Sequence, residues 1–129
     1  MPKVFVHGVP ENSKLWTALF DELRMRGIED IVALSPPGFG APIPDGFEAT
    51  QAGYRSWLIG QIEQLDCKVD LVGHDWGAMH VYGVLAERPD LVRTWAADVA
   101  GTLHPDYVWH DHCLLYTSDA ADERGCVWW

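Results

Sequence analysis

The sequence predicts an α/β fold, with a parallel sheet that carries helices on both faces. Four short apolar runs of strand length alternate with three stretches in which apolar residues recur at helical spacing. The linkers between them are short, which predicts a single β-α-β-α-β-α-β unit. Right-handed crossovers between parallel strands then place helices on both sides of the sheet.

The first half of this unit begins with residues 4–6, an apolar run typical of a buried parallel strand. A helix is expected next, with Ser13 as its N-cap and Gly27 as its stop. Its apolar face consists of Leu15, Trp16, Leu19, Phe20 and Leu23. Residues 31–34 predict a second strand, and the proline- and glycine-rich segment 35–42, "SPPGFGAP", predicts a loop.

The second half begins with a helix predicted over residues 50–65. Its apolar face consists of Tyr54, Trp57, Leu58, Ile62 and Leu65. A strand over 69–72 follows, and then a helix from about 78 to 88 that Pro89 ends. The apolar run 95–99 predicts the fourth strand.

The stretch "VGHDWGAMH" places an aspartate where a buried strand ends and a helix begins. Asp75 has Gly73 and Gly77 two positions away on either side. This turn resembles the nucleophile elbow of the α/β-hydrolase fold, with aspartate in the usual serine position. The elbow holds its central residue in a strained backbone conformation, and its neighbours must be small because strand and helix nearly touch.

An aspartate can serve as a nucleophile without a general base. A free aspartic acid has a pKa of about 3.9, so it is ionised at neutral pH, whereas a serine needs a histidine to take its proton. Amide groups at the N-terminus of the next helix favour the charged form further. Such a carboxylate can displace a halide or open an epoxide, which leaves an alkyl-enzyme ester that water must hydrolyse.

A second motif, "HGVP" at His7, Gly8, Val9 and Pro10, lies upstream. Together with "GHDWG" it resembles the aspartate-nucleophile branch of the α/β-hydrolase superfamily, chiefly epoxide hydrolases and haloalkane dehalogenases. The resemblance covers about residues 3–100 and implies a partial α/β-hydrolase fold. It also implies that the strand before His-Gly lies beside the strand before the nucleophile, where the sheet order reverses.

The resemblance assigns roles to the residues of both motifs. Asp75 would be the nucleophile, and the backbone N–H groups of Val9 and Trp76 would form the oxyanion hole. The Trp76 indole would line the pocket or hold a departing halide. Asp98, in "WAADVAG", lies where one dehalogenase group carries its catalytic acid, although an ordinary strand-end aspartate fits equally well. The residues that support the motifs are His7, Gly8, Pro10, Gly73, His74 and Gly77.

The catalytic histidine of this branch normally comes last in the chain. His104, His110 and His112 lie where the family begins its cap, which favours surface positions for them. An epoxide hydrolase is the first expectation. A haloalkane dehalogenase is the second, although one dehalogenase group uses an asparagine side chain at the position of Val9. A hydrolase of esters or lactones and a non-catalytic ligand-binding relative stay open.

Residues 113–129 do not resemble the rest of the chain. The segment 113–122, "CLLYTSDAAD", can be written as codons that resemble the transposon-end adapter of sequencing libraries, read in frame. We therefore interpret 113–129 as a non-native tail. Residues 1–112 would be the N-terminal part of a hydrolase core domain, with the cap beginning near 101–112. Such a chain is expected to be unstable, and inactive or limited to a single turnover.

Composition and net charge limit the classes of partner that this chain is expected to bind. The net charge is −10 with only 9 Lys and Arg, which argues against binding to nucleic acid or an anionic membrane. The lack of a signal peptide or a long apolar run favours a cytoplasmic protein. The three cysteines have no metal-ligand spacing, and no cofactor or metal is expected. The expected substrate is a small, apolar to moderately polar organic molecule, and the oligomeric state is not indicated.

Overall fold

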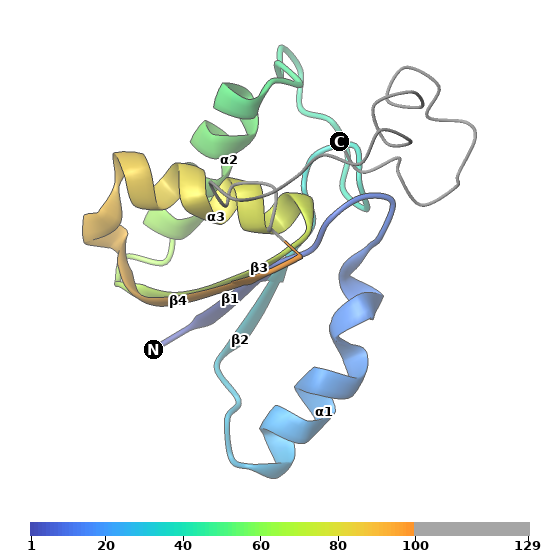
Figure 1. Cartoon of the computed structure of the whole chain (residues 1–129), viewed down its shortest axis with the longest axis vertical. Coiled ribbons are helices and arrows are strands. Elements are labelled where there is room, and N and C mark those ends of the chain that lie inside the picture. Colours follow the sequence, from blue (N-terminus) through green and yellow to red (C-terminus); the bar gives the residue numbers. More distant parts are fainter. Residues whose placement is uncertain (100–129) are drawn as a thin grey trace, which may run out of the picture.

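In the computed structural model, which describes residues 1–99, a four-stranded parallel sheet lies between helices (Figure 1). Helix α1 covers one face of the sheet, and α2 and α3 cover the other. The predicted α/β fold is confirmed. The strands are β1 (Lys3–Val6), β2 (Ile31–Leu34), β3 (Val69–His74) and β4 (Val92–Asp98). The helices are α1 (Thr17–Met25), α2 (Gln51–Glu63) and α3 (Trp76–Glu87), with 3₁₀ turns η1 (Ser13–Trp16) and η2 (Pro89–Leu91).

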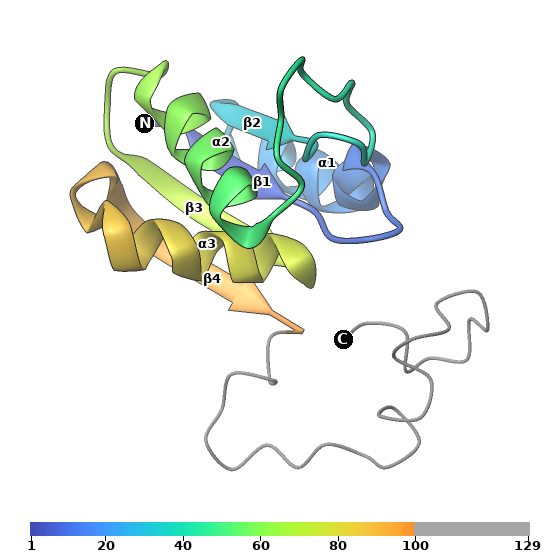
Figure 2. The ribbon, with the colours of Figure 1, turned by 90° about the horizontal axis from the view of Figure 1, so that it is seen from above.

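The order of the strands, β2-β1-β3-β4, reverses between β1 and β3. The chain leaves β1 for β2 on one side and then crosses back to β3 on the other, where Val6 pairs with Gly73. Figure 2 shows α2 and α3 over the same face of the sheet, with α1 beyond it. The carboxyl ends of β1 and β3 therefore meet at the reversal point, where open α/β sheets bind their ligands.

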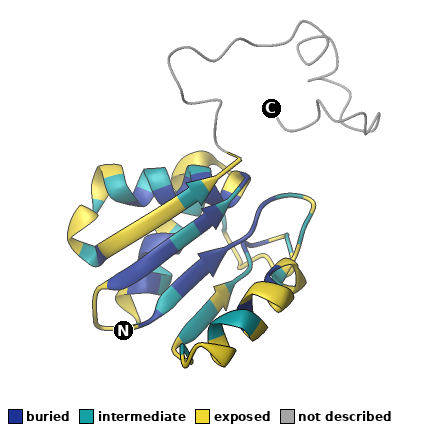
Figure 3. Cartoon of the chain, turned by 60° about the horizontal axis from the view of Figure 1, so that its bottom comes forward, coloured by how far each residue is buried: buried dark blue, intermediate teal, exposed yellow. Residues whose placement is uncertain are grey.

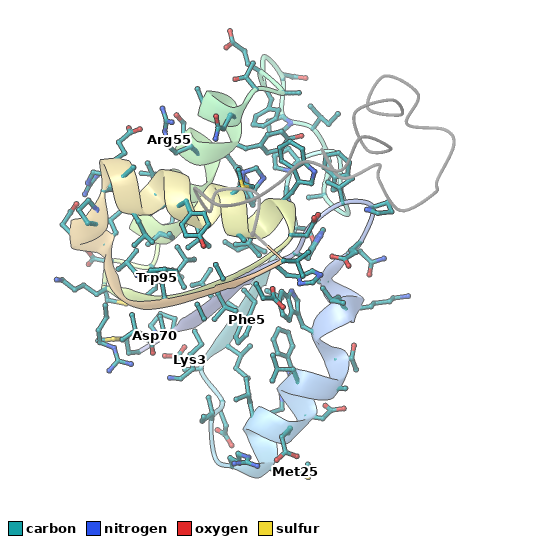
Figure 4. The ribbon with its side chains drawn as sticks, in the orientation of Figure 1. Lys3, Phe5, Met25, Arg55, Asp70 and Trp95 are labelled. Atoms are coloured by element: carbon teal, nitrogen blue, oxygen red, sulfur yellow. The ribbon has the colours of Figure 1, made fainter. Side chains whose placement is uncertain are left out.

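Two apolar clusters hold the layers together. One lies between the sheet and helices α2 and α3, and includes Val4, Val6, Leu58, Ile62, Leu71 and Val81. The other lies on the α1 face, where Phe5 packs against Trp16 and Phe20. Figure 4 shows Phe5 on this side of the sheet. Each fully buried side chain of this size contributes about 1.5–3 kcal/mol to stability. Figure 3 shows that β1 is buried along most of its length, whereas most of β4 is exposed.

Several predicted boundaries were wrong. Ser13 is not the N-cap: the Asn12 side chain accepts from the Lys14 N–H at 3.0 Å and starts η1, so that α1 begins only at Thr17. Asparagine is as favourable an N-cap residue as serine, and the two residues are adjacent in the sequence here. Helix α3 begins at Trp76 rather than at 78, because the elbow turn leads directly into it.

The fourth strand begins at Val92 rather than at 95, because its polar residues have partners on β3. Arg93 Nε donates to Asp70 Oδ1 at 2.8 Å, and Arg93 Nη2 donates to Asp70 Oδ2. Thr94 Oγ1 donates to Asp70 Oδ1 at 2.6 Å, and Lys3 Nζ lies 3.9 Å from Asp70 Oδ2. Figure 4 shows Asp70 and Lys3 at the amino end of the sheet. The buried Asp70 carboxylate thus joins β1, β3 and β4.

Replacing Asp70 with asparagine should destabilise the chain at neutral pH. The Arg93 hydrogen bond, helped by Thr94 and Lys3, lowers the pKa of Asp70 against the opposing effect of burial. A depressed folded-state pKa stabilises the chain above the unfolded value of about 4, and this contribution is lost as pH falls through the folded value. Because half of the Arg93 side chain is exposed, we expect a loss of about 1–2 kcal/mol at pH 7.

Urea unfolding from pH 7 to pH 2.5 measures this effect. The difference between the wild-type chain and Asp70→Asn should shrink as the pH falls below about 4. Asp21→Asn is the control, because Asp21 forms an exposed pair with Arg24 on α1, and it should change little. A pH-independent difference would contradict the ionic origin of the effect.

No helix within residues 1–99 has both the length and the apolar character needed to cross a membrane.

Candidate active site

Asp75 occupies the sharp turn between β3 and α3. Its backbone has φ 53° and ψ −120°, a conformation that residues other than glycine rarely adopt. The Asp75 N–H donates to the carbonyl of Asp98 at 3.2 Å, and the Asp75 carbonyl accepts from the Ala78 N–H at 3.0 Å. The Asp75 side chain is 5% exposed and does not cap α3. These bonds hold a strained residue whose carboxylate is left available for other contacts.

Three glycines are required here because backbone and carboxylate approach closely. A Cβ on Gly73 would lie 2.5 Å from the Gly77 carbonyl oxygen. One on Gly77 would lie 2.1 Å from the Val6 carbonyl oxygen, and one on Gly8 would lie 2.3 Å from Asp75 Oδ2. Real Cβ atoms do not approach other atoms this closely. The glycines of both motifs therefore allow β1, β3 and α3 to meet around the carboxylate.

The "HGVP" segment continues β1 and turns beside Asp75. The Val9 N–H donates to Asp75 Oδ2 at 3.1 Å. His7 is fully buried, and its Nδ1 lies 2.8 Å from the Gly8 carbonyl oxygen, which requires the proton on Nδ1. Pro10 is exposed and follows a cis peptide bond. The loop thus presents a backbone donor to one oxygen of the carboxylate.

A pocket of about 540 Å³ opens beside this turn. Trp76, the first residue of α3, is 40% exposed and lines it. As the first helical residue, Trp76 has no acceptor for its backbone N–H within the helix. Three residues with polar side chains, Thr50, Gln51 and His80, also line the pocket. The rest of the lining is apolar or aromatic and comes from Val9, Pro36, Phe39, Ala49, Tyr54 and Met79.

Comparison with known proteins shows which family this chain belongs to. Residues 4–125 match the model of the alpha/beta hydrolase family. The chain belongs to this family. The expected resemblance, based on the two motifs, is confirmed.

Individual relatives share part of their length with this chain. Epoxide hydrolase 2 of Siraitia grosvenorii is 35% identical over 97 residues, which cover 70% of this chain and 29% of the relative. An (E)-2-((N-methylformamido)methylene)succinate hydrolase of Acinetobacter baylyi is 29% identical over 96 residues, 74% of this chain and 36% of the relative. A haloalkane dehalogenase loop variant from Bradyrhizobium elkanii has a TM-score of 0.63 at 28% identity and matches 74% of this chain and 32% of its own. The chain therefore spans about a third of the length of the curated relatives.

Asp98 of this alpha/beta hydrolase has a partner that the sequence did not indicate. Its Oδ1 lies 2.8 Å from Nδ1 of His74, the last residue of β3. The other ring nitrogen, Nε2, lies 3.3 Å from Glu11 Oε1. Glu11 Oε2 in turn accepts from the Gly8 N–H at 3.3 Å. This chain of contacts connects the loop after β1 with the last residues of β3 and β4.

The charges around His74 predict a measurable pKa shift. Partial burial lowers the pKa of His74, but the hydrogen bond and charge of Asp98, with the charges of Glu11 and Asp75, outweigh it and raise the pKa above its ordinary value. The interaction of His74 with Asp98 therefore stabilises the chain fully below about pH 6.5. This stabilisation is lost as the pH rises through the folded-state pKa of His74. Asp98→Asn should lower the pKa of His74, as measured by NMR titration of the ring.

Glu22→Gln serves as the control for this titration, because Glu22 pairs with Arg26 on α1. The Glu22→Gln variant should leave the pKa of His74 unchanged. An unchanged His74 titration in Asp98→Asn would show that the two side chains do not interact in solution.

The sequence did not single out Glu11, Tyr54 or His80 as site residues. Glu11 directly follows "HGVP", so an acidic side chain at the end of the motif was the available signal. Tyr54 and His80 lie 26 residues apart on α2 and α3, and only the fold stacks their rings, with centroids 5.0 Å apart. No sequence pattern distinguishes such a pair from ordinary core residues.

The remaining expectations fall partly outside the described residues. His104, His110, His112, Cys113 and Cys126 all lie beyond residue 99, as does the interpreted tail. Cys67 is exposed. Within residues 1–99, no group of three or more His, Cys, Asp or Glu side chains is placed to bind a metal ion.

Proposed function

We propose that this protein is an epoxide hydrolase-like enzyme with Asp75 as its nucleophile. The observation that supports this most directly is the hydrogen bond from the Val9 N–H to Asp75 Oδ2. It fixes one oxygen of a carboxylate held on a strained elbow, and leaves Oδ1 as the oxygen that attacks. The pocket is lined by Val9, which donates to Asp75, and by Trp76, which follows Asp75 in the chain, so a small organic substrate in it would lie near the elbow.

In the first step, Asp75 Oδ1 forms a bond to one epoxide carbon. The carbon–oxygen bond of the ring breaks, and its electron pair goes to the epoxide oxygen, which must then take up a proton. The product is an ester in which Oδ2 is the carbonyl oxygen. The Val9 N–H already contacts this oxygen, and the N–H of Trp76, which has no acceptor within α3, is the second candidate donor.

In the second step, water adds to the ester carbonyl carbon, and negative charge develops on Oδ2. Donors fixed at that position stabilise the charge, an effect worth about 10²–10³ in rate per donor. The acyl carbon–oxygen bond then breaks, which releases the diol and restores the carboxylate. A base must remove a proton from the attacking water.

Two of the three histidines within residues 1–99 have a polar partner for the ring, and the third stacks on an aromatic ring. The Nδ1 of His7 faces the Gly8 carbonyl, His74 lies between Asp98 and Glu11, and the His80 ring stacks on Tyr54. None of the three pairs one ring nitrogen with a carboxylate and leaves the other nitrogen free, which is the arrangement of a histidine base. We therefore propose that this chain forms the ester and hydrolyses it slowly or not at all, so that activity stops after one turnover.

A haloalkane dehalogenase is the second candidate, and one observation favours it. Trp76 lines the pocket directly after the nucleophile, where its indole N–H can hold a departing halide. Val9 has no side-chain donor, which removes the second halide contact that an asparagine would provide at this position. The epoxide reaction needs no halide site, and for this reason it is preferred.

Mass spectrometry of the chain after incubation with styrene oxide or 1-bromohexane tests both candidates. Epoxide opening adds the whole mass of the epoxide, whereas dehalogenation adds the alkyl group and loses the halide. We expect a stoichiometric styrene oxide adduct on the peptide that contains Asp75. A label on another residue would refute the assignment of the nucleophile, and sustained diol formation would refute the single turnover.

A further inference from the structure

His80 is a buried polar residue that the proposed reaction does not use. It lies on α3, its side chain is 4% exposed, and it lines the pocket. Its Nδ1 has no hydrogen-bond partner among residues 1–99. A buried nitrogen without a partner costs about 1–3 kcal/mol, whereas an apolar side chain would fill the same space without this penalty.

The His80 ring is held in place by aromatic neighbours. It stacks on Tyr54, with the ring planes 21° apart, and the Tyr54 ring also contacts Phe39 and Phe47. The Tyr54 hydroxyl donates to the Pro37 carbonyl at 2.9 Å, so it is already satisfied. A 180° turn of the imidazole about its Cβ–Cγ bond exchanges Nδ1 with a ring carbon and preserves the stack. The ring can therefore present a nitrogen to either side.

Burial also fixes the chemistry of the ring. It lowers the pKa of His80 to about 4, so the imidazole is neutral at pH 7 and has one N–H donor and one nitrogen acceptor. No Asp, Glu, Lys or Arg side chain within residues 1–99 lines the pocket. The site therefore suits an uncharged ligand that is mostly apolar and carries one hydrogen-bonding group.

The position of the pocket connects His80 to the reacting carboxylate. The pocket is also lined by Val9 and Trp76, the residues that flank the Asp75 carboxylate in the proposed reaction. A molecule in the pocket can therefore contact the aromatic residues and also reach Val9 and Trp76, the two residues that adjoin Asp75 through a hydrogen bond and a peptide bond.

We propose that His80 determines specificity by forming a hydrogen bond to a polar group on the neutral, aromatic arm of the substrate. Phe39 and Tyr54 pack against the arm, and the reactive carbon lies at Asp75. The placement of the reactive carbon rests on the proposed function, whereas binding of the arm does not.

Binding of two ligands of the same shape tests this proposal without any chemistry at Asp75. Benzophenone carries a carbonyl acceptor, whereas 1,1-diphenylethylene has a methylene group in its place, and neither has an epoxide or a leaving group. Calorimetric titration of the full chain at pH 7 should show benzophenone binding about threefold to tenfold more tightly, the contribution of one hydrogen bond.

Variants locate the origin of this preference. His80→Phe keeps an aromatic ring against Tyr54 but removes both nitrogens, so the two ligands should bind equally. Tyr54→Phe is the matched control, because it removes a hydroxyl that is bonded to Pro37, and the preference should persist. Equal binding of both ligands to the wild-type chain, or a preference that survives His80→Phe, would overturn the proposal.

A second measurement covers the case in which His80→Phe does not fold. In the ¹⁵N-labelled wild-type chain, the ring nitrogen shifts of His80 should change on addition of benzophenone and not of 1,1-diphenylethylene. Equal responses to the two ligands would overturn the proposal. If His80 shows the preference but Asp75 is never labelled by epoxides, the proposed function fails and the arm site stands. If Asp75 is labelled but His80 shows no preference, the arm site fails and the proposed function stands.

Discussion

Replacing Asp75 with asparagine should reduce covalent labelling by styrene oxide at least about a thousandfold, the scale of losing a nucleophile. The amide has nearly the shape of the carboxylate, and its oxygen can still accept the hydrogen bond from the Val9 N–H. It lacks the negative charge that attacks carbon. The rate of adduct formation, followed by intact-protein mass spectrometry, measures the loss.

The chain offers a close control for this substitution. Asp66 is also an aspartate with a positive φ, of 51°, but it is exposed and lies in the turn after α2. Asp66→Asn therefore repeats the chemical change and the positive φ away from the pocket, and labelling should proceed at the wild-type rate. Labelling of Asp75→Asn at a comparable rate would show that another group reacts.

The sequence predicted the elements well where apolar residues determine them. Strands β1 and β2 and helix α2 lie within two residues of their expected bounds, because turn and cap residues flank their apolar runs. The prediction failed at β4, where the predicted strand began at residue 95 and left out Arg93 and Thr94. Their partner, Asp70, lies 23 and 24 residues earlier in the chain, and no local pattern shows that such residues will pair across a sheet.

The elbow was visible in the sequence because its Gly-x-Asp-x-Gly spacing is local. Gly73 must be small because of Gly77 and Ala78, which lie within five residues of it, whereas the atoms that require Gly77 to be small belong to Val6 and His7 and were not visible in the sequence. The pairing of His74 with Asp98 and Glu11 was not visible, because it joins the ends of two strands and the loop after a third, which only the strand order brings together. The pocket has the same origin, since its lining spans segments from Val9 to His80.

Replacing Gly77 with alanine should destabilise the chain by about 3 kcal/mol or more, above the usual range for overpacking. The new Cβ would lie 2.1 Å from the Val6 carbonyl oxygen and 2.9 Å from that of His7. Both are backbone atoms of the central strand and the motif after it, so no change of rotamer relieves the clash. Either α3 or β1 must move, and labelling of Asp75 should be lost together with stability.

Gly60→Ala provides the contrasting result, because Gly60 lies inside α2 and a Cβ there meets nothing within 4 Å. Alanine is the better helix former, so this variant should gain about 0.5–1 kcal/mol in urea unfolding and keep its labelling. Comparison of the two variants separates the helix preference of alanine from the steric clash of the new Cβ at residue 77. A Gly77→Ala variant that is as stable and as reactive as Gly60→Ala would contradict this prediction. It would show that α3 does not approach β1 as closely as the elbow requires, and that the Val9 N–H is not held in a fixed position beside Asp75.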